Sequence, residues 1–385
     1  MTPLAQVAAD RPAASPATRA EPIRDVRGLL ALRPHWDELL EASGSNNPFL
    51  TFEWLHAWWT HLGRHGALRA IAAWSDDRLV AVAPLMTARA FGWLPRLEFL
   101  GGGHAGSDYL DVIVRRGYEA DVLREMTTIV AGWGSTLRLD HVLEGSQAAC
   151  LADALHAHGW TRETTPNGVC PVIDLAGHTW DSYLATRGPA HRANVRRRMK
   201  ALQQQCNPSF ERVTAESARH AALSALFGFH ESRFRTRGGS SAFLTPSLRD
   251  FHHEATARML DRDRLRMYVL RIDGEAAAVM YGFACDGRFY FYQHGFDDRY
   301  RDRSIGLVLM ALTVRAALDE GMHTFDLLWG AESYKSLWAS DAVHLHRIHL
   351  FPPHLGGMLH RGAVEARQQL GTLARRVLPG NSRAR

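Results

Sequence analysis

The stretch that decides the fold is RFYFYQHGFDDRYRDRSIGLVLM, residues 288–310. Its first seven residues predict a strand, and an apolar helix is expected over residues 304–319. Gly306 stands in the first turn of that helix, where N–H groups and the helix dipole attract an anion and glycine lets a phosphate approach. Arg303 would add a charge-assisted donor. The alternative is an ordinary helix start capped by Ser304.

Strands and helices alternate on both sides of this stretch. Before it, Asp273-Gly274 and Asp286-Gly287 predict the turns of two hairpins, and after it residues 324–328 and 343–351 read as strands. A similar order of strands, helix, strand, helix and strand runs through residues 68–175. The pattern predicts two related halves of the α/β (α+β) class, each a mixed central sheet flanked by helices.

Two helices are expected before residue 68, the first over residues 26–42. The second carries Trp54 and Trp58, which share one helical face at this spacing. They predict an aromatic stripe in the core rather than a platform for a ligand. Residues 109–114 and 169–175 read as strands.

Composition divides the chain into four parts. Residues 1–20, rich in Ala and Pro, predict a flexible leader. The two halves are expected at residues 21–175 and 176–352. Residues 353–385 form a basic tail, because the chain from residue 357 onward carries six Arg and one Glu. A solvated tail is the prediction, and a basic amphipathic helix that contacts a membrane or nucleic acid is the alternative.

Composition also limits the class of protein. The chain has 385 residues, of which 46% are hydrophobic and 22% charged, so each half can bury a core. No apolar run reaches the ~20 residues that span a bilayer, and the first twenty residues lack the segments of a secretory signal. The four cysteines stand far apart, which argues against a disulfide scaffold or a cysteine zinc site. We therefore expect a cytoplasmic protein.

Other chemical motifs are absent or misplaced. Residues 101–106 contain G-x-G-x-x-G, but a strand rather than a helix is expected after them, so we interpret them as a connector and not as a dinucleotide site. The sequence lacks H-E-x-x-H, G-x-S-x-G and the P-loop signature. His344 and His346 would share a strand face without a third ligand, so no metal site is expected. His230, next to Glu231 and near Arg233, reads as a surface histidine on a helix, and a position in the substrate cleft is the alternative.

The turn into the helix at residue 304 resembles the acyl-CoA site of the GNAT acyltransferases, whose signature is [QR]-x-x-G-x-[GA]. Arg303 and Gly306 match this signature, whereas Val308 stands where Gly or Ala is usual. From about residue 25 to about residue 350, the chain is also similar to the bacterial CelD/BioF2-type acetyltransferases, which resemble the FemAB aminoacyltransferases. The segments that carry this similarity are PFLTFEW at residues 48–54 and DLLWGAESYKSLW at residues 326–338.

The resemblance implies tandem GNAT-like acyl-CoA N-acyltransferase domains, with acetyl-CoA or another acyl-CoA bound by the second half. It associates the chain with cellulose or exopolysaccharide biosynthesis, and hence with a small-molecule or glycan amine as acceptor. The residues that it places around the cofactor are Tyr292, His294, Arg303, Ser304, Ile305, Gly306, Leu307 and Val308.

Attack of an amine on a thioester needs a base for the amine proton and a proton for the departing thiolate. If the resemblance holds, we expect Glu332 or Asp326 as the base and Tyr334 as the acid. Lys335 would contact an anion or the acceptor, and residues 292–294 would supply an N–H to the oxyanion. For each side chain, a structural hydrogen bond or ion pair is the alternative.

One helix is expected to carry a basic stripe. Arg192, Arg196 and Lys200 recur at four-residue spacing within a region that has no acidic residue. A solvated face is the plain interpretation, and contact with CoA phosphates, an acidic glycan or tRNA is the alternative. Nothing resembles an RNA-binding module, and no DNA binding is expected. A tRNA-dependent FemAB-like aminoacyltransferase and a non-catalytic GNAT-like subunit of a polysaccharide-synthesis assembly stay as alternative functions.

Overall fold

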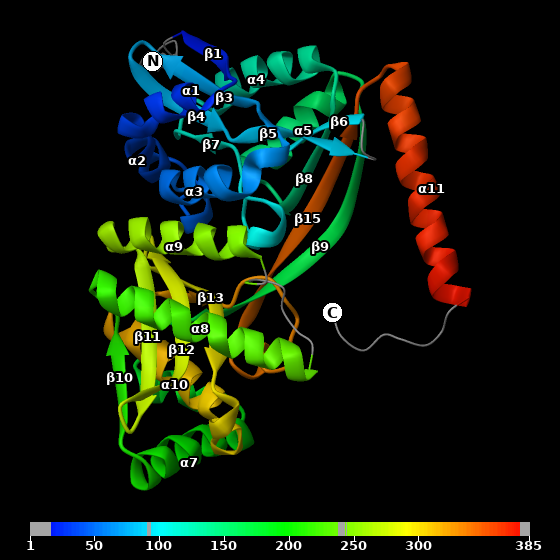
Figure 1. Ribbon diagram of the computed structural model, residues 1–385. Coiled ribbons are helices and arrows are strands. Elements are labelled where there is room, and N and C mark those ends of the chain that lie inside the picture. The colour runs from blue at the N-terminus through cyan, green and yellow to red at the C-terminus, as the bar shows by residue number, and fades with distance from the viewer. Residues whose placement is uncertain (1–16, 91–93, 238–242, 244, 378–385) are drawn as a thin grey trace, which may run out of the picture.

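The computed structural model describes residues 17–90, 94–237, 243 and 245–377 (Figure 1). The strands of its first half are β1 (Thr18–Ile23), β2 (Ala67–Leu68), β3 (Ala70–Ser75), β4 (Arg78–Ala83), β5 (Leu85–Ala90), β6 (Leu94–Phe99), β7 (Ile113–Val114), β8 (Thr136–Leu143) and β9 (Thr161–Asp174). The helices of this half are α1 (Val26–Ala31), α2 (Arg33–Ala42), α3 (Phe52–Leu62), α4 (Glu119–Trp133) and α5 (Gln147–Ala157).

The second half has the same mixture of elements. Its strands are β10 (Pro208–Arg212), β11 (Leu265–Ile272), β12 (Glu275–Cys285), β13 (Arg288–Phe296), β14 (Thr324–Asp326) and β15 (Asp341–Phe351). Its helices are α6 (Trp180–Ala185), α7 (Pro189–Gln205), α8 (Glu216–Arg237), α9 (Pro246–Asp261), α10 (Ile305–Asp319) and α11 (Leu355–Val377). Mixed sheets with helices packed on them confirm the predicted α/β class.

Two sheets organise the described chain. The smaller sheet has the order β1-β3-β4-β7, and the larger has the order β10-β11-β12-β13-β14-β9-β15-β8-β6-β5-β2. β9 and β15 pair antiparallel along their length, from Val172 opposite Asp341 to Thr161 opposite Phe351. Because β9 also pairs with β14 and β15 with β8, the larger sheet runs from one half into the other.

Helix α3 of the first half packs against helix α9 of the second half (Figure 1). Trp54 is completely buried, and its ring meets that of Phe251 edge-on at 4.8 Å between centroids. Trp58 is buried as well. The aromatic core stripe predicted for this helix is therefore confirmed, and it lies at the contact between the halves.

Several predicted boundaries near the start of the chain are wrong. Thr18 to Ala20 belong to β1, because they pair with β3 and Thr18 donates to Glu125; the leader predicted there reaches at most residue 17, and residues 1–16 lie outside the described part. The helix expected over residues 26–42 breaks at Leu32, since Pro34 cannot donate a backbone hydrogen bond to continue it.

Other differences concern strand boundaries that the local sequence does not indicate. β7 is shorter than the strand expected over residues 109–114, because Tyr109 adopts a positive φ of 57°. β9 begins eight residues before the expected strand, since the polar stretch 161–168 is paired with β15. The predicted tail is helical over residues 355–377, which form α11, as the alternative of an amphipathic helix requires. No helix in the described ranges is both long and apolar enough to cross a membrane.

Candidate functional site

A cavity of about 1550 Å³ opens where the second half faces the first. The start of α10, the end of β13 and the segment after β14 line it from the second half, and residues 104–106 and 168–169 line it from the first. The predicted site residues that the cavity brings together are Tyr292, His294, Ser304, Ile305, Gly306, Leu307, Glu332, Tyr334 and Lys335. The predicted site residues outside its lining are Arg192, Arg196, Lys200, Arg303, Val308 and Asp326.

The cavity enters the sheet where two parallel strands separate. β13 and β14 pair in register only as far as Tyr290 opposite Asp326, although β13 continues to Phe296. On the other edge of β13, the register with β12 shifts so that Tyr292 is the extra residue of a bulge. A bulge turns backbone groups out of the ladder. The end of β13 can therefore present N–H groups to a ligand between the strands.

The start of α10 provides a second set of backbone donors. Ser304 has a φ of 54°, and its carbonyl accepts the N–H groups of Leu307 and Val308. The earlier N–H groups, those of Ile305 and Gly306, belong to the turn that has no intrahelical acceptor. A Cβ on Gly306 would lie 3.3 Å from the Phe296 ring. A side chain at this position would therefore crowd the Phe296 ring, and glycine avoids that contact.

Three details of this helix start differ from the sequence-based prediction. Ser304 stands at the N-cap position, as the alternative interpretation has it, but its side chain makes no capping hydrogen bond. Arg303 is exposed and donates to the Cys206 sulfur, whereas Arg301 lines the cavity. Val308 is buried and does not line the cavity, so its side chain does not narrow it.

The segment after β14 is fixed by Lys335. The Lys335 ammonium donates to the carbonyl oxygens of Leu328 and Trp329 at 3.2 and 2.9 Å and lies 3.0 Å from Glu332. These partners occupy all three of its N–H donors. Lys335 therefore holds the segment rather than offering a free donor. The Glu332 side chain is half exposed, and its carboxylate folds back over Gly330, which has a φ of 127°.

Three titratable side chains that line the larger cavity have shifted pKa values. Burial, helped by Glu332, raises the pKa of Tyr334 above its ordinary range, so its hydroxyl keeps its proton at neutral pH. The Tyr334 and His294 ring centroids are 6.0 Å apart. Burial lowers the pKa of His294 to about 3 and that of His230 to about 4. Both imidazoles are therefore neutral near pH 7.

The alternative position for His230, in the cleft rather than on the surface, is the one that the structure shows. His230 lines the cavity from α8, and its Nε2 lies 2.9 Å from the carbonyl oxygen of His294. Since a carbonyl only accepts, this nitrogen carries the proton. Arg233, one helical turn further on, lines the same wall. The spacing of these two residues on one helix was the available signal.

Asp326 is completely buried behind the cavity wall. Its Oδ2 accepts from the Tyr109 hydroxyl at 2.8 Å and from Arg288 at 3.2 Å, and its Oδ1 accepts the N–H of Leu328 at 2.8 Å. Leu328 has a positive φ of 55°, which is uncommon for such a residue. Asp326 and Lys335 thus hold opposite sides of this strained residue.

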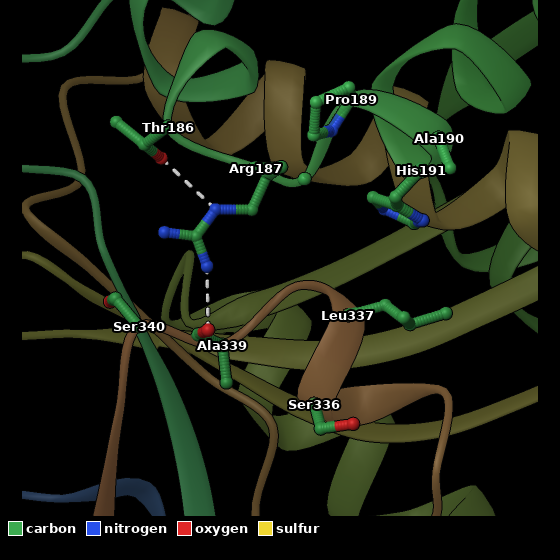
Figure 2. Close-up of a pocket in the computed structure, with 10 residues that line it drawn as sticks. Thr186, Arg187, Pro189, Ala190, His191, Ser336, Leu337, Ala339 and Ser340 are labelled. Carbon is green, nitrogen blue, oxygen red and sulfur yellow. Dashed lines mark hydrogen bonds between the residues drawn. The ribbon is translucent and has the colours of Figure 1, made fainter.

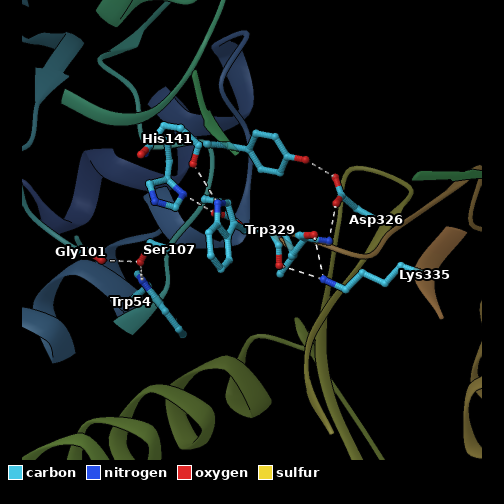
Figure 3. Close-up of polar contacts among 11 residues, drawn as sticks. Trp54, Gly101, Ser107, His141, Asp326, Trp329 and Lys335 are labelled. Atoms are coloured by element: carbon cyan, nitrogen blue, oxygen red, sulfur yellow. Dashed lines mark hydrogen bonds and ion pairs between the residues drawn. The ribbon is translucent and has the colours of Figure 1, made fainter. Parts of the chain in front are cut away.

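The first half holds the same segment through the residue next to Tyr109. Asp108 is buried, and its two oxygens lie 2.8 Å from the N–H of Trp329 and 2.6 Å from Nδ1 of His141. Figure 3 shows these contacts converging on the Trp329 segment. Sequence reasoning missed Asp108 and Tyr109, although they directly follow the glycine-rich connector at residues 101–106.

The titration of the Asp326 carboxyl makes the free energy of unfolding depend on pH, and a variant at this position can test the direction of that dependence. Burial raises its pKa to about 6 from 3.8, outweighing its hydrogen bonds. The folded state therefore binds the extra proton between these values, so this contribution is complete below about pH 4 and is lost as the pH rises through about 6. We expect Asp326→Asn to gain about 2–3 kcal/mol relative to the wild type between pH 4 and pH 7.

Urea unfolding at several pH values measures this difference. Asp319→Asn, which alters an exposed carboxylate at the end of α10, serves as the control and should follow the wild type. A constant difference between Asp326→Asn and the wild type would contradict the assigned titration.

A smaller cavity of about 450 Å³ lies between the start of α7 and the segment at residues 336–340. Figure 2 shows Arg187 between these elements, with its guanidinium bonded to Thr186 and Ala339. Leu337 lines both cavities. The basic stripe of α7 lies beyond this cavity on the surface: Arg196 pairs with Asp181, and both are exposed. The stripe therefore does not reach the larger cavity.

One of the comparisons with known proteins matches a protein family over the part of the chain that contains most of the cavity lining. Residues 189–336 match the family model described as "Acetyltransferase (GNAT) domain". No curated protein matches the sequence. Within the described ranges, no group of three or more histidine, cysteine, aspartate or glutamate side chains could hold a metal ion.

Solved structures resemble the fold at low identity. The crystal structure of FemX covers 82% of this chain and 95% of its own, at 11% identity and a TM-score of 0.58. A putative lysylphosphatidylglycerol synthetase C-terminal domain from Agrobacterium fabrum covers 83% and 92%, at 11% identity and a TM-score of 0.53. L-PGS from Bacillus licheniformis covers 82% and 90%, at 14% identity and a TM-score of 0.51.

These findings show what the protein resembles. Residues 189–336 of the second half match a GNAT acetyltransferase domain, and the two halves together share the fold of FemX and of the lysylphosphatidylglycerol synthetase structures. In this fold the separated strands β13 and β14 and the start of α10 surround one cavity.

Proposed function

We propose that the chain moves an acyl group from a CoA thioester to an amine. The observation that carries this proposal is the convergence of two sets of backbone donors on one cavity. The bulged end of β13 stands on one side, and the start of α10 with Gly306 stands on the other. Neither set needs a particular side chain, which suits a ligand that combines a thioester with a pyrophosphate.

Charge supports the position of the phosphates. The cavity lining contains three cations, of which Lys335 is paired with the single acid, Glu332, and Arg301 lies just before the start of α10 in the sequence. The pyrophosphate would lie at the N–H groups of Ile305 and Gly306, where the helix dipole adds to the charge of Arg301. The acyl-pantetheine arm would then extend between β13 and β14 toward the other end of the cavity.

The cavity wall contains groups for each proton transfer. The amine nitrogen attacks the thioester carbon while Glu332, half exposed at the cavity mouth, takes the proton of the amine. An N–H group of residues 292–294 stabilises the oxyanion. When the carbon–sulfur bond breaks, Tyr334 gives its proton to the thiolate. Tyr334 suits this role because burial keeps its hydroxyl protonated.

Asp326 and Lys335 would act on this chemistry indirectly. Asp326 lies outside the cavity lining, so we assign it the positioning of the catalytic segment instead of the role of base. Lys335 orients the Glu332 carboxylate at 3.0 Å. The buried pair His294 and His230 would keep the wall near the acyl group neutral.

We propose that the acceptor of the acyl group is an amino sugar or glycan amine. Trp329 is 54% exposed and lines the cavity beside Gly168, and its Nε1 donates to the carbonyl oxygen of Asn167 at 2.9 Å. An exposed indole ring offers a flat apolar surface on which a sugar ring can lie. Together with the similarity of the segment DLLWGAESYKSLW to CelD/BioF2-type proteins, this favours a role in cellulose or exopolysaccharide biosynthesis.

The solved structures of similar fold support one alternative donor of the acyl group. FemX and lysylphosphatidylglycerol synthetase are aminoacyl-transferases, so an aminoacyl-tRNA is the second candidate. The surface stripe with Arg192, Arg196 and Lys200 could contact RNA. The same residues lie outside the cavity lining, and for this reason we favour acyl-CoA.

Thiol release from acetyl-CoA, measured with a panel of amino sugars and their oligomers, tests the proposed function. We expect release that depends on an added amine. Transfer from aminoacyl-tRNA together with no reaction of acetyl-CoA or longer acyl-CoAs would refute the assignment of the donor.

A further inference from the structure

Helix α11 carries a surface that the proposed reaction does not use. It leaves the larger sheet after β15 and extends along the side of the molecule (Figure 1). One face of its first turns is fixed to the body. His360 is buried against the rings of His349 and Phe351, and its Nδ1 lies 2.9 Å from the Thr136 hydroxyl. The orientation of the helix start is therefore set.

A cluster of exposed apolar side chains occupies another face of the same turns. Leu355, Met358 and Leu359 are 73%, 66% and 62% exposed, more than any other large hydrophobic residue of the described part. Residues three and four positions apart share one side of a helix. Contiguous apolar patches of this kind mark interaction surfaces. The sequence continues the same spacing with Ala366, Leu370, Leu373 and Val377.

The sequence that carries this apolar stripe is mostly positive in charge. Residues 357–385 contain six Arg and one Glu, a net charge of +5, which equals the net charge of the whole chain. The remaining residues therefore balance to zero. Arg361 pairs with Glu163 at 3.4 Å and with Glu365 at 2.7 Å. The other five arginines of this stretch follow residue 366 in the sequence.

We propose that α11 binds the surface of an anionic membrane. Its apolar stripe, which begins with Leu355, Met358 and Leu359, would lie among the lipid chains at the interface, and anionic lipid phosphates would attract the basic sequence that follows. Apolar residues on one side and concentrated positive charge are the two features that such a surface needs. The helix would lie in the plane of the interface and hold the rest of the chain in water beside it.

Vesicle co-sedimentation of the full chain tests this inference. We expect binding to vesicles of phosphatidylcholine with about one-third phosphatidylglycerol, and at least tenfold weaker binding to phosphatidylcholine alone, because lipid charge attracts each basic residue. The triple variant Leu355→Glu, Met358→Glu and Leu359→Glu should reduce binding to anionic vesicles at least tenfold. Raising the salt concentration should weaken the binding of the wild type.

A matched control distinguishes binding through this surface from nonspecific binding through any exposed apolar residue. Val26 and Leu30 on α1 are also exposed, at 41% and 47%, and Val26→Glu with Leu30→Glu should leave vesicle binding unchanged. Equal binding to both vesicle types, equal loss in the two sets of variants, or no binding by the wild type would overturn the inference. So would a dimer in solution that the α11 variant dissociates, since a second copy would then cover the stripe.

Discussion

Replacing Gly306 with glutamate is expected to lower the affinity for acetyl-CoA by roughly a thousandfold. The new carboxylate would stand at the start of α10, where we place the pyrophosphate. Two like charges about 4 Å apart near a protein surface repel by about 4 kcal/mol, and each 1.4 kcal/mol or so is a factor of ten in affinity. Calorimetric titration of acetyl-CoA measures the change.

Gly306→Gln is the matched control for this variant. Glutamine has the size of glutamate without its charge, and its Cβ meets the same Phe296 ring at 3.3 Å. We expect it to lose about tenfold in affinity through crowding. An equal loss in both variants would mean that no anion lies at Gly306. Thermal unfolding of both variants shows whether α10 still packs on the sheet.

Glu332→Gln and Tyr334→Phe are expected to reduce kcat by about a hundredfold or more each, because each removes one proton-transfer group. The affinity for acetyl-CoA should stay within a few-fold of the wild type, since the pyrophosphate contacts lie at the other end of the cavity. Amine-dependent thiol release measures kcat, and calorimetry measures the affinity.

Ser336→Ala controls for changes to the same segment. The Ser336 hydroxyl donates to the carbonyl oxygen of Ser333 at 2.8 Å and lines only the smaller cavity. Its turnover should match the wild type. Full turnover in Glu332→Gln and Tyr334→Phe would remove these residues from the mechanism and leave the position of the cofactor intact. Loss of acetyl-CoA affinity in the same variants would assign them to binding instead.

Much of the site could be predicted because its chemistry is local in the sequence. The helix start at Gly306 and the segment with Glu332 and Tyr334 are short motifs, and both line the cavity. The glycine also has a steric reason, the nearby Phe296 ring. Arg303 matches the signature in residue type and spacing, but it ends the 3₁₀ turn Asp298–Arg303, and its guanidinium donates to the Cys206 sulfur instead.

The contacts between distant parts of the chain could not be predicted. Asp108 and Tyr109 act on a segment more than two hundred residues away, and no local pattern carries that information. β9 shows the same limit in the fold: residues 161–168 contain Pro166 and Gly168, which weaken a strand pattern, yet pairing with β15 holds them extended. Tertiary pairing outweighed local preference in both cases.

The most direct test of the central claim is a calorimetric titration of acetyl-CoA and CoA into the full-length wild-type protein. The account predicts one site per chain with micromolar affinity for both ligands, because most of the contacts are made to the shared phosphates. No measurable binding of acetyl-CoA, CoA or longer acyl-CoAs would contradict it, and the cavity between the halves would then need a different ligand.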